Sequence, residues 1–511
     1  MNRRKRWNCF VLAVILLIQT CCGDWMPQSE RNMAAEFGMN VKRVYASDQL
    51  PSDKKKKAGQ GAESLSENMN SAVPAAQITT PSATDAAQTS TLPAVETPTP
   101  IPSQPVETSE PQPTEKVDLK PESVKKIYFC GRGHHKVMIS WKSSEKASYY
   151  LVYRRSAGKG KYTQRARVKN VKYLDHSLKY GKKYQYKVIA VNDADGIHKS
   201  GGVTAVYSNQ TIVHTRHQKY SYQEMKGDIQ SIQKKYHGIV KANIIGKSED
   251  GRNIYDVVVG NPKASKTLLV VANLHAREYM TSQLCMDQIE YYLENYYAGN
   301  SWKKTFDRIA VHYIPMANPD GTTISQYGIK SIRSASLRKK LYKMNRGSTK
   351  IWKSNARGVD LNRNYPVRFR HQGKRGNMGY SGPRACSESE TRAIKGLTDR
   401  LTSDHNLQGV VSYHAMGSII FGGSGLGGKL QKNTDKLYHQ TRRITGYASA
   451  ASYHSSSGGD GNYLTYIQNI KRVPGITLEI GRIACPGPSW EYPSIWKKNK
   501  MVVIRAAKLF A

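Results

Sequence analysis

The sequence predicts an α/β domain, built on a mixed sheet flanked by helices, that follows an all-β sandwich and a long linker. From about residue 220 onward, continuous apolar runs such as TLLVVAN, IAVHYIP and GITLEIG alternate with stretches of helical period, including YSYQEMKGDIQSIQKKYH. Before them, short runs such as VMISWKS, YYLVYRR and KYQYKVIAV have the spacing of a β-sandwich. Residues 72–121 are rich in Pro, Thr, Ser, Ala and Gln and lack aromatic residues, so they cannot bury a core.

The N-terminal segment has the arrangement of an export signal. A basic cluster at residues 3–6 precedes an apolar run at 10–18, which is shorter than the roughly 20 residues that span a bilayer. We therefore expect a secreted or cell-surface protein, with Cys21 or Cys22 as the candidate for lipid attachment and membrane anchoring. The predicted parts are a signal peptide or lipoprotein signal (1–23), a disordered linker (24–121), the β-sandwich (122–215) and the α/β domain (216–511).

The chain is strongly basic. It has 78 Lys and Arg against 38 Asp and Glu, a net charge of +40, which attracts polyanions. For an exported protein, the expected partners are anionic cell-wall polymers or lipid headgroups, and a solvated basic surface without a partner is the alternative. We expect no nucleic-acid partner, because no recognition motif is present.

Cysteines are few for an exported protein of this length. The chain has seven, and the four that follow the N-terminal segment have no spacing typical of zinc sites. At most one or two disulfides are expected, with Cys386 and Cys485 as one conceivable pair.

A pair of metal-ligand side chains follows the run TLLVVAN. His275 and Glu278 are three residues apart at the expected start of a helix, so both side chains can face one ion. His414, at the end of the run GVVSYHA, can supply a third ligand from another strand. Two His and one Glu leave a fourth tetrahedral position open, as in catalytic zinc sites. An isolated HxxE pair is more often an ordinary surface pair, so its meaning depends on the residues that follow.

Glu479 ends the apolar run GITLEIG. A carboxylate in such a place is costly unless it has a partner or a role. It could take a proton from the attacking water at the metal and return it to the leaving amine. A structural salt bridge with a nearby arginine is an equal alternative.

The segment GVDLNRNY offers an amide, Asn362, beside a guanidinium, Arg363. An arginine fork binds a carboxylate with two parallel hydrogen bonds, so this pair could hold the end of a peptide. Upstream, Arg346 could place a cation beside the scissile carbonyl and stabilise its developing negative charge.

The region from about 220 to the end resembles the zinc metallocarboxypeptidases of the carboxypeptidase A family. The resemblance includes HARE, PMANPDG, GVDLNRNYP, SESET, SYH and TLEIG in this order. It implies a hydrolase with one zinc ion in this domain. It also implies residue roles: His275, Glu278 and His414 as zinc ligands, Arg277 and Arg346 at the substrate carbonyl (Arg357 being an alternative to Arg346), Asn362 and Arg363 at a carboxylate, and Glu479 as general base and acid.

One position departs from the family pattern. The family has a mobile Tyr ahead of a Gly-rich loop, where this chain has Tyr453 followed by His454, and either could take that accessory role. In the same loop, Asp460 could meet a substrate amine, although an ordinary loop cap is the simpler interpretation.

The stretches HAREYMTSQL and NYLTYIQNIKRVPGITLEIG look like the bacterial branch that cleaves the γ-D-glutamyl–diaminopimelate bond of peptidoglycan. This resemblance implies a peptidoglycan stem peptide as substrate, with Arg363 on a diaminopimelate carboxylate. A carboxypeptidase acting on ordinary peptides, perhaps with basic ends, is one alternative. An inactive cell-wall-binding protein is another.

The segment from 124 to 215 resembles a fibronectin type III domain. Trp141 stands at the place of that family's core Trp, and Leu178 with Tyr184 resembles its Leu and tyrosine-corner pair. The resemblance implies a spacer or binding module rather than a catalytic part.

Overall fold

The computed structural model describes residues 118–192, 197–214, 218–297, 300–345, 348–404, 406–450 and 460–511. Contacts group residues from Asp118 to Ala511 into one compact unit. The predicted signal segment and nearly all of the predicted linker lie outside the described residues. Within the described ranges, no helix combines the length and the apolar character needed to cross a membrane.

The first part of this unit is a sandwich of two antiparallel sheets. One has the order β1-β2-β5 and the other the order β4-β3-β6-β7. Trp141 is 4% exposed and its ring meets that of Tyr150 at a centroid distance of 5.3 Å. The Tyr184 hydroxyl accepts a hydrogen bond of 2.8 Å from the backbone N–H of Lys179, which ties the start of β6 to the preceding loop. The strands are β1 (Tyr128–Gly131), β2 (Val137–Ser140), β3 (Tyr149–Ser156), β4 (Lys159–Val168), β5 (Lys172–Asp175), β6 (Lys182–Val191) and β7 (Val203–Asn209).

The second part contains an eight-stranded mixed sheet, as predicted. Its order is β14-β13-β15-β12-β10-β11-β9-β8, and the central strands β15, β12, β10 and β11 run parallel. The strands are β8 (Val240–Lys247), β9 (Asn253–Val259), β10 (Lys266–Ala272), β11 (Ile309–Ile314), β12 (Leu407–His414), β13 (Ile419–Phe421), β14 (Ala448–Ser449) and β15 (Gly475–Glu479).

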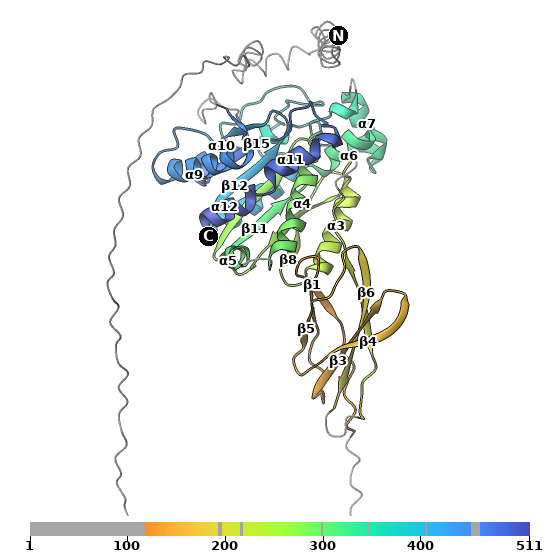
Figure 1. The fold of residues 1–511 in the computed structure, drawn as a ribbon. Helices are drawn as coiled ribbons and strands as arrows, with labels where there is room; N and C mark the ends of the chain where they lie inside the picture. The colour runs from red at the N-terminus through yellow and green to blue at the C-terminus, as the bar shows by residue number, and fades with distance from the viewer. Residues whose placement is uncertain are drawn as a thin grey trace, which may run out of the picture. The chain divides into compact units, whose positions relative to one another are not determined.

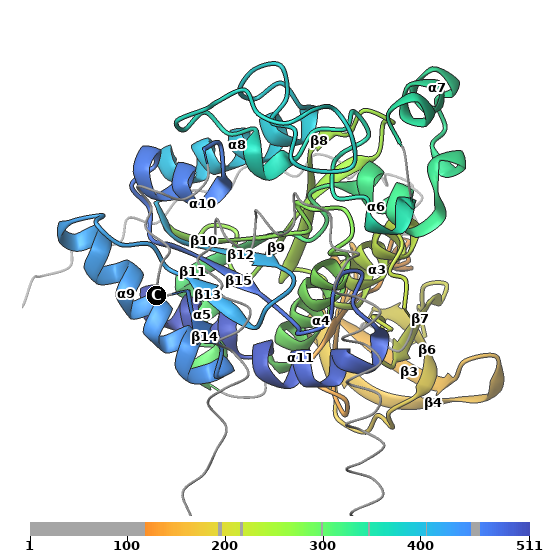
Figure 2. The same ribbon diagram turned by 90° about the horizontal axis from the view of Figure 1, so that it is seen from above.

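Helices cover both faces of this sheet, because its central strands are apolar on both sides. Along β10, Leu268 and Val270 pack into one core and Leu269 and Val271 into another. Figure 2 shows α8 and α10 on one side of the sheet and α4, α9 and α11 on the other. The main helices are α3 (Tyr222–Lys235), α4 (Met280–Asn295), α5 (Asn300–Arg308), α6 (Pro319–Tyr327), α7 (Ala335–Met344), α8 (Ser389–Ser403), α9 (Gly428–Thr445), α10 (Tyr463–Thr465), α11 (Tyr492–Asn499) and α12 (Val502–Phe510).

Helices α3 and α4 lie side by side (Figure 1), and a buried charge cluster joins them to the segment that follows β7. Lys235 of α3 donates to Glu294 of α4 at 2.6 Å and to Glu290 at 3.2 Å. The Glu290 carboxylate also accepts the backbone N–H groups of Ile212 and Val213, which follow β7. Each of these charged groups is paired, which is the condition for burying it at an acceptable cost.

Candidate metal centre

The loop between β10 and α4 is shaped by asparagine side chains. Asn273 adopts a left-handed conformation, with φ of 60°, and its Nδ2 donates to the carbonyl of His275 at 2.9 Å. Asn318, from the PMANPDG segment, donates to the carbonyl of Leu274 at 3.1 Å. These two bonds hold the loop at the carboxyl end of the sheet, where sites gather in folds of this kind.

His275 and Glu278 lie in a turn rather than in a helix, contrary to the sequence-based expectation. The backbone N–H of Glu278 bonds to the carbonyl of His275 at 3.1 Å, and α4 begins only at Met280. The turn brings the two side chains together as a first helical turn would. The HxxE spacing therefore predicts the contact but not the element that makes it.

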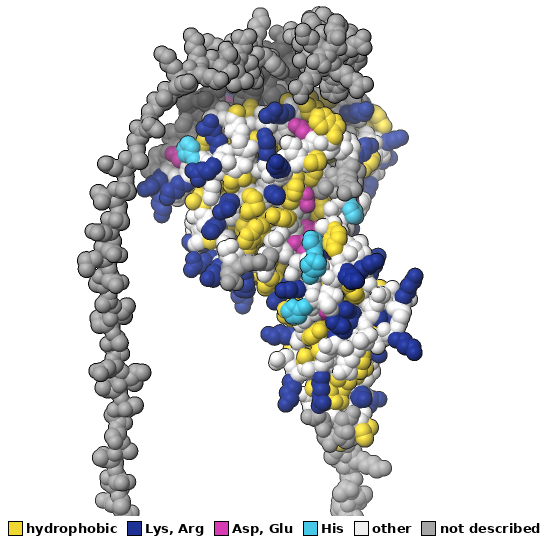
Figure 3. All heavy atoms as spheres, viewed as in Figure 1, with side chains coloured by type: hydrophobic (Ala, Val, Ile, Leu, Met, Phe, Trp, Pro, Cys, Tyr) yellow, Lys and Arg dark blue, Asp and Glu magenta, His cyan; other side chains and the backbone are white. Residues whose placement is uncertain are grey.

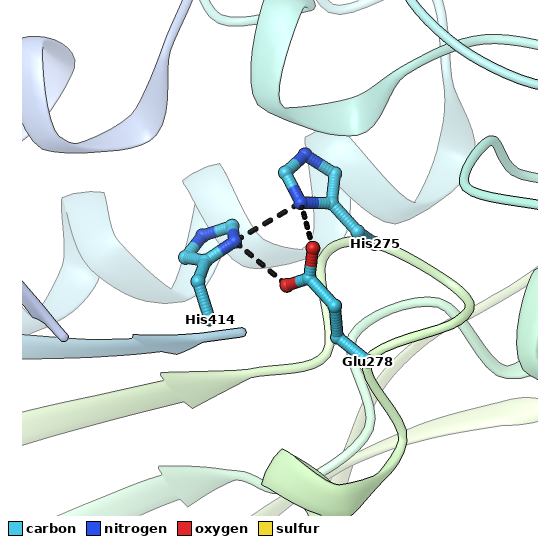
Figure 4. A group of neighbouring side chains, drawn as sticks. All are labelled: His275, Glu278 and His414. Atoms are coloured by element: carbon cyan, nitrogen blue, oxygen red, sulfur yellow. Dashed lines mark hydrogen bonds and ion pairs between the residues drawn. The ribbon is translucent and has the colours of Figure 1, made fainter. Parts of the chain in front are cut away.

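His414 reaches the same point from the end of β12, which is the parallel neighbour of β10. Its Nδ1 lies 3.1 Å from Nδ1 of His275 and 3.0 Å from Oε2 of Glu278. His275 Nδ1 lies 2.8 Å from Oε1 of the same carboxylate. Figure 4 shows the three side chains converging on one another.

These side chains fit a zinc ion. Their ligand atoms lie within 4.8 Å of one another, and the three residues are 6%, 3% and 2% exposed. Two nitrogen ligands on a tetrahedral zinc are about 3.4 Å apart, close to the separation of the two imidazole nitrogens. Two imidazoles and a carboxylate are also the donor set of catalytic zinc sites, which keep one position open.

Asp360 orients the His275 ring through its Nε2, the nitrogen that does not contact Glu278 and His414. Its Oδ1 lies 3.2 Å from the Nε2 of His275, so that nitrogen carries the proton and Nδ1 is left to bind a metal. Burial opposes ionisation of Asp360, but His275 and then Lys353 lower the pKa of this carboxyl. In the same way His275 and His414 overcome burial and lower the pKa of Glu278. Both carboxylates are therefore ionised at neutral pH.

Glu479 stands beside the metal ligands because β15 pairs with β12, which puts Glu479 directly opposite His414. Burial raises the pKa of the Glu479 carboxyl to about 7, against the pull of the His414 charge. The negative charge of Glu278 adds to the increase, whereas Lys353 and Arg277 reduce it. A carboxyl poised near neutrality can both accept and return a proton.

The positive charges nearest to Glu479 come partly from a residue that the sequence did not single out. Lys353 Nζ lies 4.0 Å from Asp360 Oδ2, and its charge acts on Glu479 as that of Arg277 does. Arg346, predicted to line the carbonyl, lies outside the described residues. Its alternative, Arg357, points to Glu249 at 3.3 Å and to Glu388 at 3.5 Å.

Asn362 and Arg363, the residues predicted to bind a carboxylate (the carboxylate clamp), are both in contact with the backbone of residues 461–463. The side-chain oxygen of Asn362 accepts the N–H of Tyr463 at 2.9 Å. Gly461 packs against the carbonyl of Arg363, where an added Cβ would lie 2.2 Å from that oxygen, so only glycine fits. The Arg363 charge contributes to the lowered pKa of Asp360, after His275 and Lys353.

The Asp460 carboxylate forms ion pairs with two arginines. Arg370 Nε lies 2.8 Å and Arg368 Nε 3.8 Å from its carboxylate oxygens. Its predicted role with a substrate amine therefore competes with two ion pairs already present. Tyr453 and His454, the two candidates for the accessory role, lie outside the described residues.

The described cysteines form no disulfide. Cys130, Cys285, Cys386 and Cys485 are all free thiols. The conceivable pair of Cys386 with Cys485 is therefore not formed.

Comparisons with known proteins identify a family and several relatives of this chain. Residues 225–482 match the family described as zinc carboxypeptidase. The γ-D-glutamyl-L-diamino acid endopeptidase 1 of Lysinibacillus sphaericus is 27% identical over 293 residues, covering 55% of this chain and 70% of that protein. Human carboxypeptidase A6 is 21% identical over 241 residues, covering 46% of this chain and 52% of that protein. The solved thrombin-activatable fibrinolysis inhibitor has a TM-score of 0.47 at 16% identity, covering 59% of this chain and 77% of that one.

Proposed function

The chain belongs to the zinc carboxypeptidase family, and from this premise we propose that it hydrolyses the γ-D-glutamyl–diaminopimelate bond of peptidoglycan stem peptides. Its activity class, a zinc metallopeptidase, follows from the family itself. The substrate is the proposed part. It is supported by the relative from Lysinibacillus sphaericus, named as a γ-D-glutamyl-L-diamino acid endopeptidase, and by the charges around the carboxylate clamp.

The observation that carries the substrate proposal is the arginine-rich side of the site. Gly461 seats the backbone of Arg363 beside Asp460, and Arg368 and Arg370 converge on that carboxylate. Among the described residues there, the guanidinium groups of Arg368 and Arg370 meet the carboxylate of Asp460. Such an edge suits a substrate with several carboxylates, as a stem peptide has, better than a peptide with a basic end.

In the mechanism we propose, the side chains of this chain bind, orient and move protons. His275, Glu278 and His414 would hold zinc, which when bound acts as a Lewis acid on the scissile carbonyl and on water. Glu479, with its raised pKa, accepts the proton of the attacking water and passes it to the leaving amine.

Two cations complete the chemistry. Arg277, which the family resemblance puts at the substrate carbonyl, and Lys353, whose Nζ lies 4.0 Å from Asp360 Oδ2, would stabilise the negative charge that develops on the carbonyl oxygen. Asn362 and Arg363 would bind a substrate carboxylate and so fix which bond lies over Glu479. Arg346, which lies outside the described residues, remains the predicted cation at the substrate carbonyl.

The location of the protein is also part of the proposal. We expect export through residues 1–23, either with cleavage or with retention on a lipid anchor, and a fibronectin type III-like role for the sandwich as a spacer or wall-binding module. The basic N-terminal segment and the order of strands in the two sheets support these expectations.

The test is a digest of purified muropeptides, followed by mass spectrometry, with and without a zinc chelator. We expect cleavage at the γ-D-glutamyl–diaminopimelate bond, abolished by the chelator and by Glu479→Gln. Cleavage of ordinary peptide C-termini but not of muropeptides would refute the substrate. An absence of bound zinc and of any hydrolysis would favour the inactive wall-binding protein.

A variant separates the substrate alternatives further. Arg370→Gln should raise KM for stem peptides several-fold and, by releasing Asp460, improve the cleavage of peptides with basic ends. Arg400→Gln, an exposed arginine on α8, is the matched control and should change neither. Equal effects of the two substitutions would contradict the proposal that Arg368 and Arg370 face the carboxylates of the substrate.

A further inference from the structure

The β-sandwich concentrates positive charge on one stretch of chain. Between residues 147 and 192, which span β3 to β6, the sequence has twelve Lys and Arg and a single acidic residue, Asp175. Asp175 is fully buried and accepts hydrogen bonds from Arg154 at 2.7 Å and from the Tyr186 hydroxyl at 2.8 Å. Among the described residues of these strands, positively charged side chains therefore predominate at the surface (Figure 3).

Part of this charge surrounds a hollow at the β3–β4 hairpin. The hollow has a volume of about 290 Å³, and no acidic side chain lines it. Among its lining cations, Arg154 is the one with a described carboxylate partner. The charged and aromatic residues that line the hollow are Arg154, Arg155, Lys159, Lys161, Arg165 and Tyr184.

The strand register fixes these cations next to one another. Lys159 stands opposite Ser156, and Thr163 stands opposite Arg154. Arg165 is held by a hydrogen bond of 2.7 Å to the Ser177 hydroxyl, and its buried Nε has no hydrogen-bond partner. Like charges held this close repel one another, so an anion seated among them would be bound favourably.

The aromatic rings at the hollow and beside it show what kind of anion fits. The Arg154 guanidinium lies 4.9 Å from the ring centre of Tyr184, and the Arg155 guanidinium lies 4.5 Å from the ring centre of Tyr162. These ring faces are covered by cations. Single-stranded nucleic acids need open aromatic faces on which bases can stack, so this surface suits a charged backbone without bases.

We propose that the β3–β4–β6 surface of the sandwich binds a linear cell-wall polymer with repeating phosphodiester groups joined by polyols. Lysine and arginine donors recognise phosphate oxygens, and a flexible chain can place successive phosphates along the hairpin. The choice of a wall polymer rests on the wall substrate proposed above, whereas the phosphate chemistry rests on the sandwich alone. Binding would hold the catalytic domain at the wall without occupying its metal centre.

Binding of poly(glycerol phosphate) by the full chain tests the proposal. The variant Lys159→Gln/Lys161→Gln removes two exposed charges from the hollow, and Lys429→Gln/Lys432→Gln removes two exposed charges from α9 as the matched control. We expect the first variant to weaken binding about tenfold. It should also reduce the slope of log Kd against log salt by about one to two, because fewer counterions are released.

The control variant should bind within about twofold of the unaltered protein, and both variants should cleave soluble muropeptides at the unaltered rate. Equal binding by the two variants would overturn the proposal, because charge alone would then account for the affinity. Tighter binding of single-stranded DNA of the same charge would overturn it in favour of nucleic acid. A failed muropeptide digest leaves this measurement unaffected, so the two proposals fail separately.

Discussion

Replacing Asp360 with asparagine removes the charge that orients His275, while the side chain keeps its size and an oxygen that can accept the same hydrogen bond. In the native chain, the Asp360 carboxylate lies 3.2 Å from His275 Nε2 and also accepts the backbone N–H of Asn362 at 3.0 Å. Substituting such a partner of a metal-ligating histidine typically weakens metal binding about 10- to 100-fold. This corresponds to about 1.4 to 2.7 kcal/mol of zinc-binding free energy.

The measurement is the zinc Kd, obtained by competition with a chromophoric chelator at fixed pH and salt. The chain offers a matched control in His312 and Asp256, whose side chains lie 3.0 Å apart in β11 and β9 and form no part of the metal centre. Asp256→Asn should leave the zinc Kd unchanged. A zinc Kd for Asp360→Asn within twofold of the native value, or an equal loss in the control, would refute the orienting role.

Glu479→Gln should keep zinc bound but lower the rate of hydrolysis by about 100- to 10,000-fold, and a near-native rate would show that another group moves the proton. Lys235→Met leaves Glu294 buried without its cation and should lower the free energy of unfolding in urea by about 3–5 kcal/mol. The control Lys303→Met, which removes an exposed ion pair, should cost less than about 1 kcal/mol. Equal costs would contradict the buried cluster. Burial and nearby negative charge raise the pKa of Glu390 to about 8. The folded state therefore holds a proton that the unfolded chain loses above about pH 4.3, and the free energy of unfolding falls as pH rises toward 8. The stability of Glu390→Gln relative to the unaltered protein should therefore increase between pH 5 and 8, and a pH-independent difference would contradict this.

Much of the fold could be predicted because it depends on local patterns. The run TLLVVAN is apolar at successive positions, so both faces of the strand can be buried, and it forms the central strand β10. The amphipathic stretch after residue 220 forms α3. The mixed sheet followed from the alternation of such runs with helices. The predicted helix start at His275 was wrong, because Asn273 and Asn318 hold the chain in a turn before α4.

The linear order of residues shows which chemical groups this chain carries and at which strand ends they stand. His275 and Glu278 after one strand, His414 at the end of another and Glu479 at the end of a third are all readable in the linear order, because parallel strands bring their carboxyl ends to one edge. Together with the resemblance to the zinc metallocarboxypeptidases, these residues predict a zinc peptidase.

The neighbours that shift the pKa values of these groups become visible only in the folded chain. Asp360 reaches His275 across 85 residues, and Lys353 comes near Glu479 from a segment without periodicity or motif of its own. The sheet register and the loops packed over it set such contacts, and no local pattern encodes them. The same holds for Asp460, whose ion pairs with Arg368 and Arg370 no local pattern indicates.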